Sequence, residues 1–129
     1  MSKPKILIQF DSDAHPSVFD AVVAVDSGVD HLLQYAALEP TQVRDLTHGA
    51  MFTRGPQDLQ NTAIFIGGSN VAQGEELLAA VKRCFFGPMR VSVLLDANGA
   101  NTTAAAAVIA AARHLKLSET TATVLAATG

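Results

Sequence analysis

Carboxylate, amide and hydroxyl side chains gather in three short loops, each of which directly follows an apolar run. The first loop spans residues 11–17, the second is Gly67-Gly68-Ser69-Asn70, and the third spans residues 96–103. In a parallel α/β sheet, ligands bind beyond the carboxyl ends of the strands. If each apolar run is a strand, the three loops meet along one edge of the sheet, and a binding site is expected there.

Each loop also has a purely structural interpretation. Asp13 and Ser17 are suited to capping the helix that follows them. Asn101 or Thr102 is suited in the same way to capping the alanine-rich helix that follows the third loop. The Gly67-Gly68 pair fits a turn as well as the close approach of a ligand. Asp11 and Asp96 both end strongly apolar strands, where a carboxylate must be solvated, capping or paired. For these two residues, a functional and a structural role remain equally open.

The other reactive residue types give weaker signals. Arg54 is a single cation in a Thr-Arg-Gly loop, and it either meets an acidic ligand tail or is simply solvated. The four histidines, at positions 15, 31, 48 and 114, lack metal-ligand spacing. Cys84 has no recognisable histidine partner and is interpreted as a core residue. We therefore predict neither a metal site nor nucleophilic catalysis.

The elements that would position these loops alternate between strand and helix. We expect strands over residues 5–10, 31–35, 63–66, 91–95 and 121–126, and helices over 17–25, 40–47, 71–86 and 102–115. In the second helix Gly49 is expected to be the stop signal. Strands separated by helix-length segments indicate a parallel sheet. The predicted fold is a three-layer α/β domain with helices on both faces of the sheet.

The last predicted strand raises a physical difficulty. No helix follows it to return the chain across the sheet, because only three residues come after position 126. We interpret it as the first strand of a further, nucleotide-binding domain. Residues 1–120 would then form the amino-terminal α/β domain, and residues 121–129 the start of a truncated second one.

Composition narrows the function classes. The 129 residues include 49% hydrophobic and only 16% charged residues, where about 25% charged is typical, so part of the surface is expected to be covered by another domain or subunit. The net charge is −3 without clustered Lys or Arg, which argues against nucleic-acid binding. No apolar run approaches the ~20 residues of a membrane span. The single cysteine favours a cytoplasmic location.

Several of these segments, in order, resemble one known family. Gln9-Phe10-Asp11 with Asp13, the run Pro16-Ser17-Val18-Phe19-Asp20, Thr53-Arg54-Gly55, the run 62–68, Phe85-Phe86-Gly87-Pro88 and the run 95–106 are similar to the methylene-tetrahydromethanopterin dehydrogenases. Together these segments are distributed over most of the chain, from residue 9 to residue 106. Any one of these segments is weak evidence for the family, but the whole set in this order is quite specific for it.

The resemblance implies a fold, a reaction and a set of ligand contacts. In that family the amino-terminal domain packs against a Rossmann domain, the pterin lies in the cleft between them, and hydride passes from the methylene carbon to NADP or NAD. Some members also accept methylene-tetrahydrofolate. The implied substrate-binding residues are Asp11, Asp13, Ser17, Asp20, Arg54, Gly67, Gly68, Asp96, Asn98, Asn101, Thr102 and Thr103. Gly129 would begin the dinucleotide loop, although Ala127-Thr128-Gly129 departs from its Gly-x-Gly pattern.

The leading hypothesis is therefore the pterin-binding half of an NAD(P)-dependent oxidoreductase, inactive alone because the later catalytic residues are absent. Two other hypotheses stay open: a free-standing pterin-binding or carrier module, and a structural subunit that pairs with a separate chain. We also expect an exposed apolar surface where a further domain would dock, and a homo-oligomer.

Overall fold

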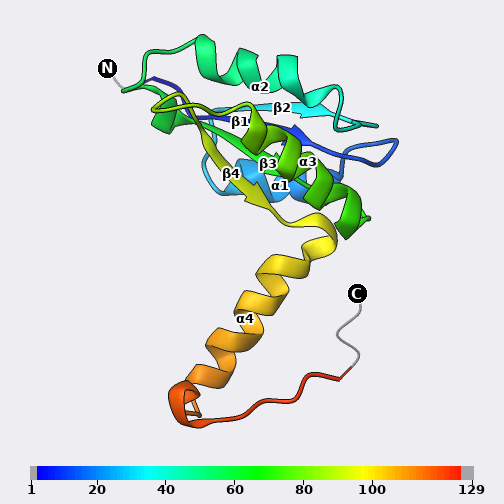
Figure 1. Ribbon diagram of the computed structural model, residues 1–129, viewed down its shortest axis with the longest axis vertical. Coiled ribbons are helices and arrows are strands. Elements are labelled where there is room, and N and C mark those ends of the chain that lie inside the picture. The colour runs from blue at the N-terminus through cyan, green and yellow to red at the C-terminus, as the bar shows by residue number, and fades with distance from the viewer. Residues whose placement is uncertain (1–2, 126–129) are drawn as a thin grey trace.

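The computed structural model describes residues 3–125, whose four strands form one parallel sheet (Figure 1). In chain order the strands are β1 (Ile6–Phe10), β2 (His31–Tyr35), β3 (Thr62–Ile66) and β4 (Ser92–Leu95). Their spatial order is β2-β1-β3-β4, so β1 and β3 lie at the centre. These strands follow the first four predicted runs closely, because each run is short, apolar and bounded by polar or glycine residues.

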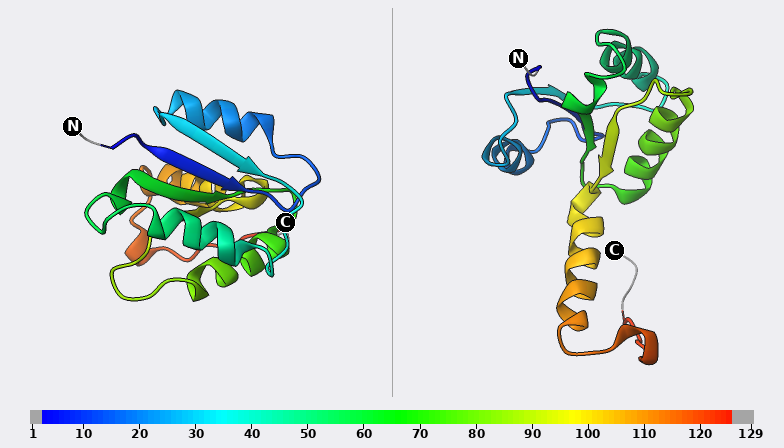
Figure 2. Two further views of the ribbon diagram at one scale, coloured as in Figure 1. Left: turned by 90° about the horizontal axis from the view of Figure 1, so that it is seen from above. Right: turned by 90° about the vertical axis from the view of Figure 1, so that its left-hand side faces the viewer.

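Helices cover both faces of this sheet, as the sequence predicts (Figure 2). On one face lies α1 (Val18–Asp26). On the other lie α2 (Val43–Phe52) and α3 (Val71–Arg83), with a 3₁₀ turn, η1 (Leu59–Asn61), leading into β3. The three-layer α/β architecture is confirmed.

The two faces of the sheet are packed differently. Alternate strand residues such as Ile8, Phe10, Ile64 and Ile66 join the main core, where side chains from α2 and α3 bury them. The opposite face carries Gln9, which is 1% exposed and accepts a hydrogen bond from Gln34 Nε2 at 2.9 Å. That face is covered mainly by α1, which leaves part of β3 and β4 open.

Two helix boundaries differ from the prediction. The second helix starts at Val43 rather than near residue 40, and it continues through Gly49 to Phe52. The extra turn buries Ala50 and Met51, and this gain exceeds the ~1 kcal/mol that a glycine costs inside a helix. The third helix ends at Arg83 instead of near 86, because the chain then reverses in a turn in which Phe86 pairs with Met89.

The fourth helix leaves the body of the molecule (Figure 1). After β4 comes a 3₁₀ turn, η2 (Ala97–Gly99), in which Asn98 (φ 54°) and Gly99 (φ 63°) are both left-handed. From there α4 (Ala100–Ala112) points away from the sheet, and it has no buried residue. It starts and ends slightly earlier than the predicted span, residues 102–115.

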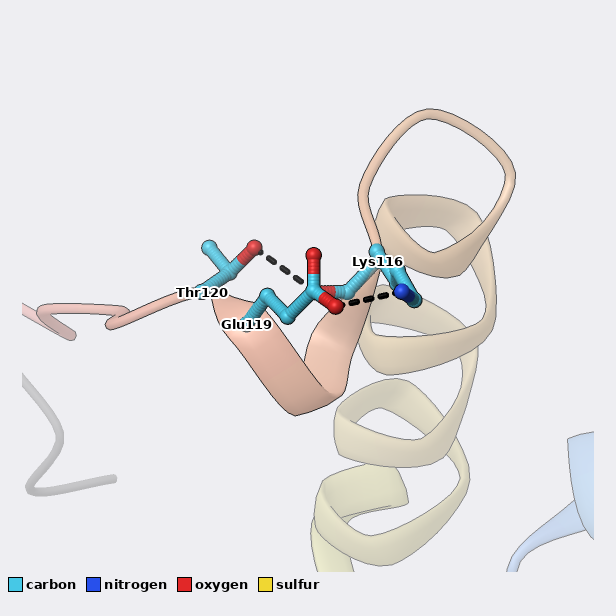
Figure 3. Close-up of polar contacts among 3 residues, drawn as sticks. All are labelled: Lys116, Glu119 and Thr120. Atoms are coloured by element: carbon cyan, nitrogen blue, oxygen red, sulfur yellow. Dashed lines mark hydrogen bonds and ion pairs between the residues drawn. The ribbon is translucent and has the colours of Figure 1, made fainter.

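The predicted strand over residues 121–126 is wrong for its described part. A third 3₁₀ turn, η3 (Leu117–Glu119), is closed by a Lys116–Glu119 ion pair and by Thr120 Oγ1, which donates to Lys116 O at 2.9 Å (Figure 3). Residues 121–125 then follow without regular structure, and residue 126 lies outside the described range. A strand forms only against a partner strand, and the segment pairs with none of the four. The proposed domain boundary at residue 120 stays a prediction.

Within residues 3–125, no helix combines the length and the apolar character needed to cross a membrane.

Candidate functional site

The loops that follow β1, β3 and β4 meet at the carboxyl edge of the sheet, as predicted. Backbone hydrogen bonds join them in series: Gly67 N donates to Phe10 O at 2.9 Å, and Asp96 N donates to Ile66 O at 2.9 Å. Asn98 N donates to Gly68 O at 2.7 Å. We call this edge the rim, defined by residues 11–20, 67–70 and 96–103.

Asp11 occupies the centre of the rim and is completely buried. Its Oδ1 accepts from Asp13 N at 2.8 Å, and its Oδ2 accepts from Ser17 N at 3.2 Å. The carboxylate thus fixes the turn that leads into α1, which answers how a charged group can end an apolar strand. Because no part of it reaches the surface, Asp11 cannot contact a ligand at the rim directly.

Asp13 and Ser17 hold the rim together. Asp13 accepts two hydrogen bonds from Ser69, from the backbone N and from Oγ, both at 2.9 Å. Asp13 therefore joins the first loop to the second and does not cap the helix. Ser17 is the N-cap of α1, and its Oγ accepts from Asp20 N at 3.2 Å. For Ser17 the capping interpretation is correct.

Asp96 anchors the start of α4. Its Oδ1 accepts from Thr102 N at 2.9 Å and its Oδ2 accepts from Thr102 Oγ1 at 2.6 Å. Asn101 Nδ2 donates to Leu95 O at 2.8 Å. The helix start is held by Asp96, and neither Asn101 nor Thr102 is its N-cap. Thr103 lies exposed in the first turn of α4.

Asp20 is the rim carboxylate with the most unfavourable surroundings. It is half-buried, and this burial raises the pKa of its carboxyl group above the usual value; a hydrogen bond with Ser17 opposes the rise, and the nearby charges of Asp11 and Asp96 add to it. The first loop, the first turn of α1 and the third loop thus bring three carboxylates into mutual range. The rim is an electronegative site that favours a ligand able to donate hydrogen bonds or carry positive charge.

The two rim glycines are explained by close packing within the protein. At Gly68 (φ 101°) a Cβ would lie 2.7 Å from Ser12 Oγ, so a side chain there would collide with the first loop. At Gly67 a Cβ would lie 3.1 Å from both Asp20 Oδ2 and Phe65 Cε1. The space beside both glycines is filled by the chain's own side chains, which favours the structural interpretation of this pair.

An open groove of about 600 Å³ runs from the rim along the face of the sheet that α1 covers only in part. Phe19 and Val23 of α1 form one wall, and Phe65 and Leu94 of the sheet form the floor. At the rim end it is lined by Asp20, Asp96 and Thr102. Sequence reasoning missed the apolar part of this site, although the alternation along β3 and β4 places Phe65 and Leu94 on the face opposite Ile64 and Ile66.

One predicted substrate-binding residue, Arg54, is not brought to the rim. Arg54 Nη1 donates to Pro4 O at 2.9 Å and to Asn61 O at 3.1 Å, which places this side chain at the amino edge of the sheet, opposite the rim. Gly129 lies outside the described residues. Among residues 3–125, no three His, Cys, Asp or Glu side chains are grouped so as to hold a metal ion.

Comparison with known proteins identifies the family. The family model described as "Methylene-tetrahydromethanopterin dehydrogenase, N-terminal" matches residues 18–98, which is more than half of the chain. The chain belongs to this family. The matched region includes α1, the strands β2, β3 and β4, the second rim loop and the first residues of the third.

Two relatives from Methylorubrum extorquens support membership of the methylene-tetrahydromethanopterin dehydrogenase family. The "Bifunctional protein MdtA" is 55% identical over 108 residues, covering 84% of this chain and 37% of the relative. The "NAD(P)-dependent methylenetetrahydromethanopterin dehydrogenase" is 38% identical over 102 residues, covering 79% of this chain and 34% of the relative. The chain thus spans about a third of the length of the curated relatives it matches.

Proposed function

We propose that this chain is the pterin-binding part of a dehydrogenase that transfers hydride from methylene-tetrahydromethanopterin, or methylene-tetrahydrofolate, to NADP or NAD. The observation that carries the proposal is the convergence of Asp11, Asp20 and Asp96 at the rim of a family member's sheet, above an apolar groove. The name of one relative supplies the reaction and the nicotinamide cofactor. A cytoplasmic location and a homo-oligomer belong to the same proposal.

The chemistry of this reaction suits an electronegative rim. A hydride that leaves a carbon held between two nitrogens leaves behind a delocalised cation, and no proton has to be transferred. Fixed negative charge near that cation lowers the barrier. In this proposal the carboxylates of Asp11, Asp13, Asp20 and Asp96 supply the field, and Asn98, Asn101, Thr102 and Thr103 offer hydrogen bonds to the pterin.

The described residues do not fit a nicotinamide dinucleotide. Its diphosphate needs a helix start free of negative charge. The glycine loop before α3 comes nearest, but Asp13 accepts both hydrogen bonds from Ser69 there, and Asp11 lies 3.1 Å from a Cβ built at Gly68. The proposal therefore places the cofactor outside these residues, in a partner domain or chain that brings nicotinamide and pterin into contact.

Calorimetric titration of this chain tests the proposal. We expect tetrahydromethanopterin and tetrahydrofolate to bind, since the rim and the groove are complete in residues 3–125. NADP and NAD should give no heat of binding, because the rim repels their phosphates. Absence of binding by both pterins would overturn the proposal. Tight binding of NADP would overturn the assignment of the cofactor to another domain or chain.

A further inference from the structure

The rim carboxylates differ in how much of their hydrogen-bonding capacity is already used within the protein. Asp11, Asp13 and Asp96 each accept at least two hydrogen bonds within the rim, backbone N–H groups among the donors. For the Asp20 carboxylate, the interaction with the side chain of Ser17 is the only one of this kind in the described part of the chain. An ionised carboxylate accepts about four hydrogen bonds, so Asp20 keeps the largest unused capacity.

Asp20 also lies where a ligand can reach it. Its side chain lines the rim end of the apolar groove, next to Phe19 on the same helix. The groove holds about 600 Å³, which lies within the range of small-molecule sites. Phe65 and Leu94 form a broad apolar floor on which a flat ring can lie. Asp11, by contrast, is fully buried and cannot touch a ligand.

The donor pattern of a pterin matches a carboxylate at such a position. The pyrimidinone ring presents a ring amide N–H beside an exocyclic amino group, and two parallel N–H donors pair with the two oxygens of one carboxylate. We propose that Asp20 is the specificity-determining residue for the pterin, accepting these two hydrogen bonds while the rings lie in the groove. The inference rests on the proposed function, which requires that the pterin be recognised, and it assigns this recognition to one residue.

Electrostatics explains why Asp20 should strongly favour a ligand that donates hydrogen bonds over one that does not. The charged groups that face it are Asp11, which follows β1, and Asp96, which follows β4, and both repel its negative charge. Burial adds to this repulsion and raises the pKa of Asp20. Two N–H donors from a ligand counteract these unfavourable contributions, so pterin binding should lower the pKa of Asp20 and release protons in mildly acidic buffer.

The test compares three chains by calorimetry with tetrahydrofolate and tetrahydromethanopterin. In Asp20→Asn one acceptor oxygen becomes an amide donor, so we expect affinity to fall at least about tenfold. Asp26→Asn, at the exposed far end of the same helix, is the matched control and should bind like the wild type. Circular dichroism and thermal unfolding establish that each variant is folded.

Two further measurements use the wild-type chain and remain informative if Asp20→Asn does not fold. Binding in two buffers of different ionisation enthalpy should reveal proton release in mildly acidic solution. A tetrahydrofolate analogue without the exocyclic amino group should bind the wild type at least about tenfold more weakly, and should bind Asp20→Asn with no further loss.

The outcomes separate this inference from the proposed function. Pterin binding that is unchanged in Asp20→Asn, or equal affinity of the wild type for both tetrahydrofolate forms, overturns the role of Asp20 and leaves the proposed function standing. Failure of the wild-type chain to bind any pterin overturns both.

Discussion

At the scale of residues, the rim shows how one kind of side chain is used in different ways. Asp11 and Asp13 accept backbone N–H groups and so fix the loops. Asp96 does the same for the first turn of α4. Asp20 alone is set against an apolar groove with its charge poorly compensated. In a binding site, residues held by internal hydrogen bonds usually form the scaffold, and a group whose charge is poorly compensated usually contacts the ligand.

The raised pKa of Asp20 predicts a pH-dependent stability. Because the folded-state pKa lies above the 3.8 of a free aspartate, protonation stabilises the fold; this contribution is complete below pH 3.8 and is lost as pH rises through the folded pKa. Asp20→Asn removes the charge, so at neutral pH the variant should be at least as stable as the wild type.

Urea unfolding of both chains from about pH 4 to 7 measures this difference. The gap in free energy of unfolding should narrow toward the acidic end, where wild-type Asp20 is increasingly protonated. A gap that widens on acidification would contradict the raised pKa.

At the scale of elements, two helical glycines have opposite surroundings. Gly74 of α3 packs against the sheet so closely that a Cβ would lie 2.9 Å from both Ala97 Cβ and Leu95 Cδ1. Gly49 of α2 has nothing within 4 Å of such an atom. Close contact at Gly74 holds α3 near the chain that leads from β4 into the rim.

Replacing each glycine by alanine should therefore change stability in opposite directions. Gly74→Ala is expected to lower the free energy of unfolding by about 1–3 kcal/mol through overpacking. Gly49→Ala is expected to raise it by up to about 1 kcal/mol, because alanine is the better helix former. Urea unfolding measures both, and a shift of the same sign in the two variants would refute this account of α3.

Much of this arrangement can be predicted from the sequence, and each part that cannot has a specific physical cause. Short apolar runs reveal four strands, and parallel topology then brings Asp11, Gly67 and Asp96 to one edge. Helix ends depend on tertiary burial, as Met51 shows by extending α2 past Gly49. Arg54 was misplaced because its loop connects a helix to a strand, and such loops lie at the amino edge of a parallel sheet.

Hydrogen-bond partners are the part of the site that no spacing reveals. Asp13 lies 56 positions from Ser69, so their pairing is invisible in a linear pattern. Helix capping, hydrogen bonds between loops and ligand contacts all use the same residue types. Only the three-dimensional arrangement separates Asp20 from its neighbours.

At the scale of the whole molecule, α1 and α4 expose large apolar side chains that the core does not bury. Val18, Val22 and Val25 of α1 are all more than half exposed, as are Val108 and Ile109 of α4. Surfaces of this kind mark contact areas. They fit the low content of charged residues. In the longer relatives, of which the match covers about a third, the unmatched residues offer one way of covering such a surface.

We expect this chain to self-associate as its concentration rises and to bind a dye that reports apolar surface. Light scattering over a dilution series measures the association. Val22→Lys and Ile109→Lys place charge on the two exposed helices and should shift the chain toward monomer without lowering its thermal stability, since neither side chain is buried. A strict monomer that binds no dye would contradict the expectation.

The outward course of α4 has one more consequence, which concerns cooperativity. A helix that buries nothing shares almost no free energy with the sheet, so its thirteen residues follow a helix–coil equilibrium of their own. Alanine favours that helix, but so short a segment is only marginally stable in water. Warming should therefore loosen α4 gradually, well before the sheet gives way in a single step.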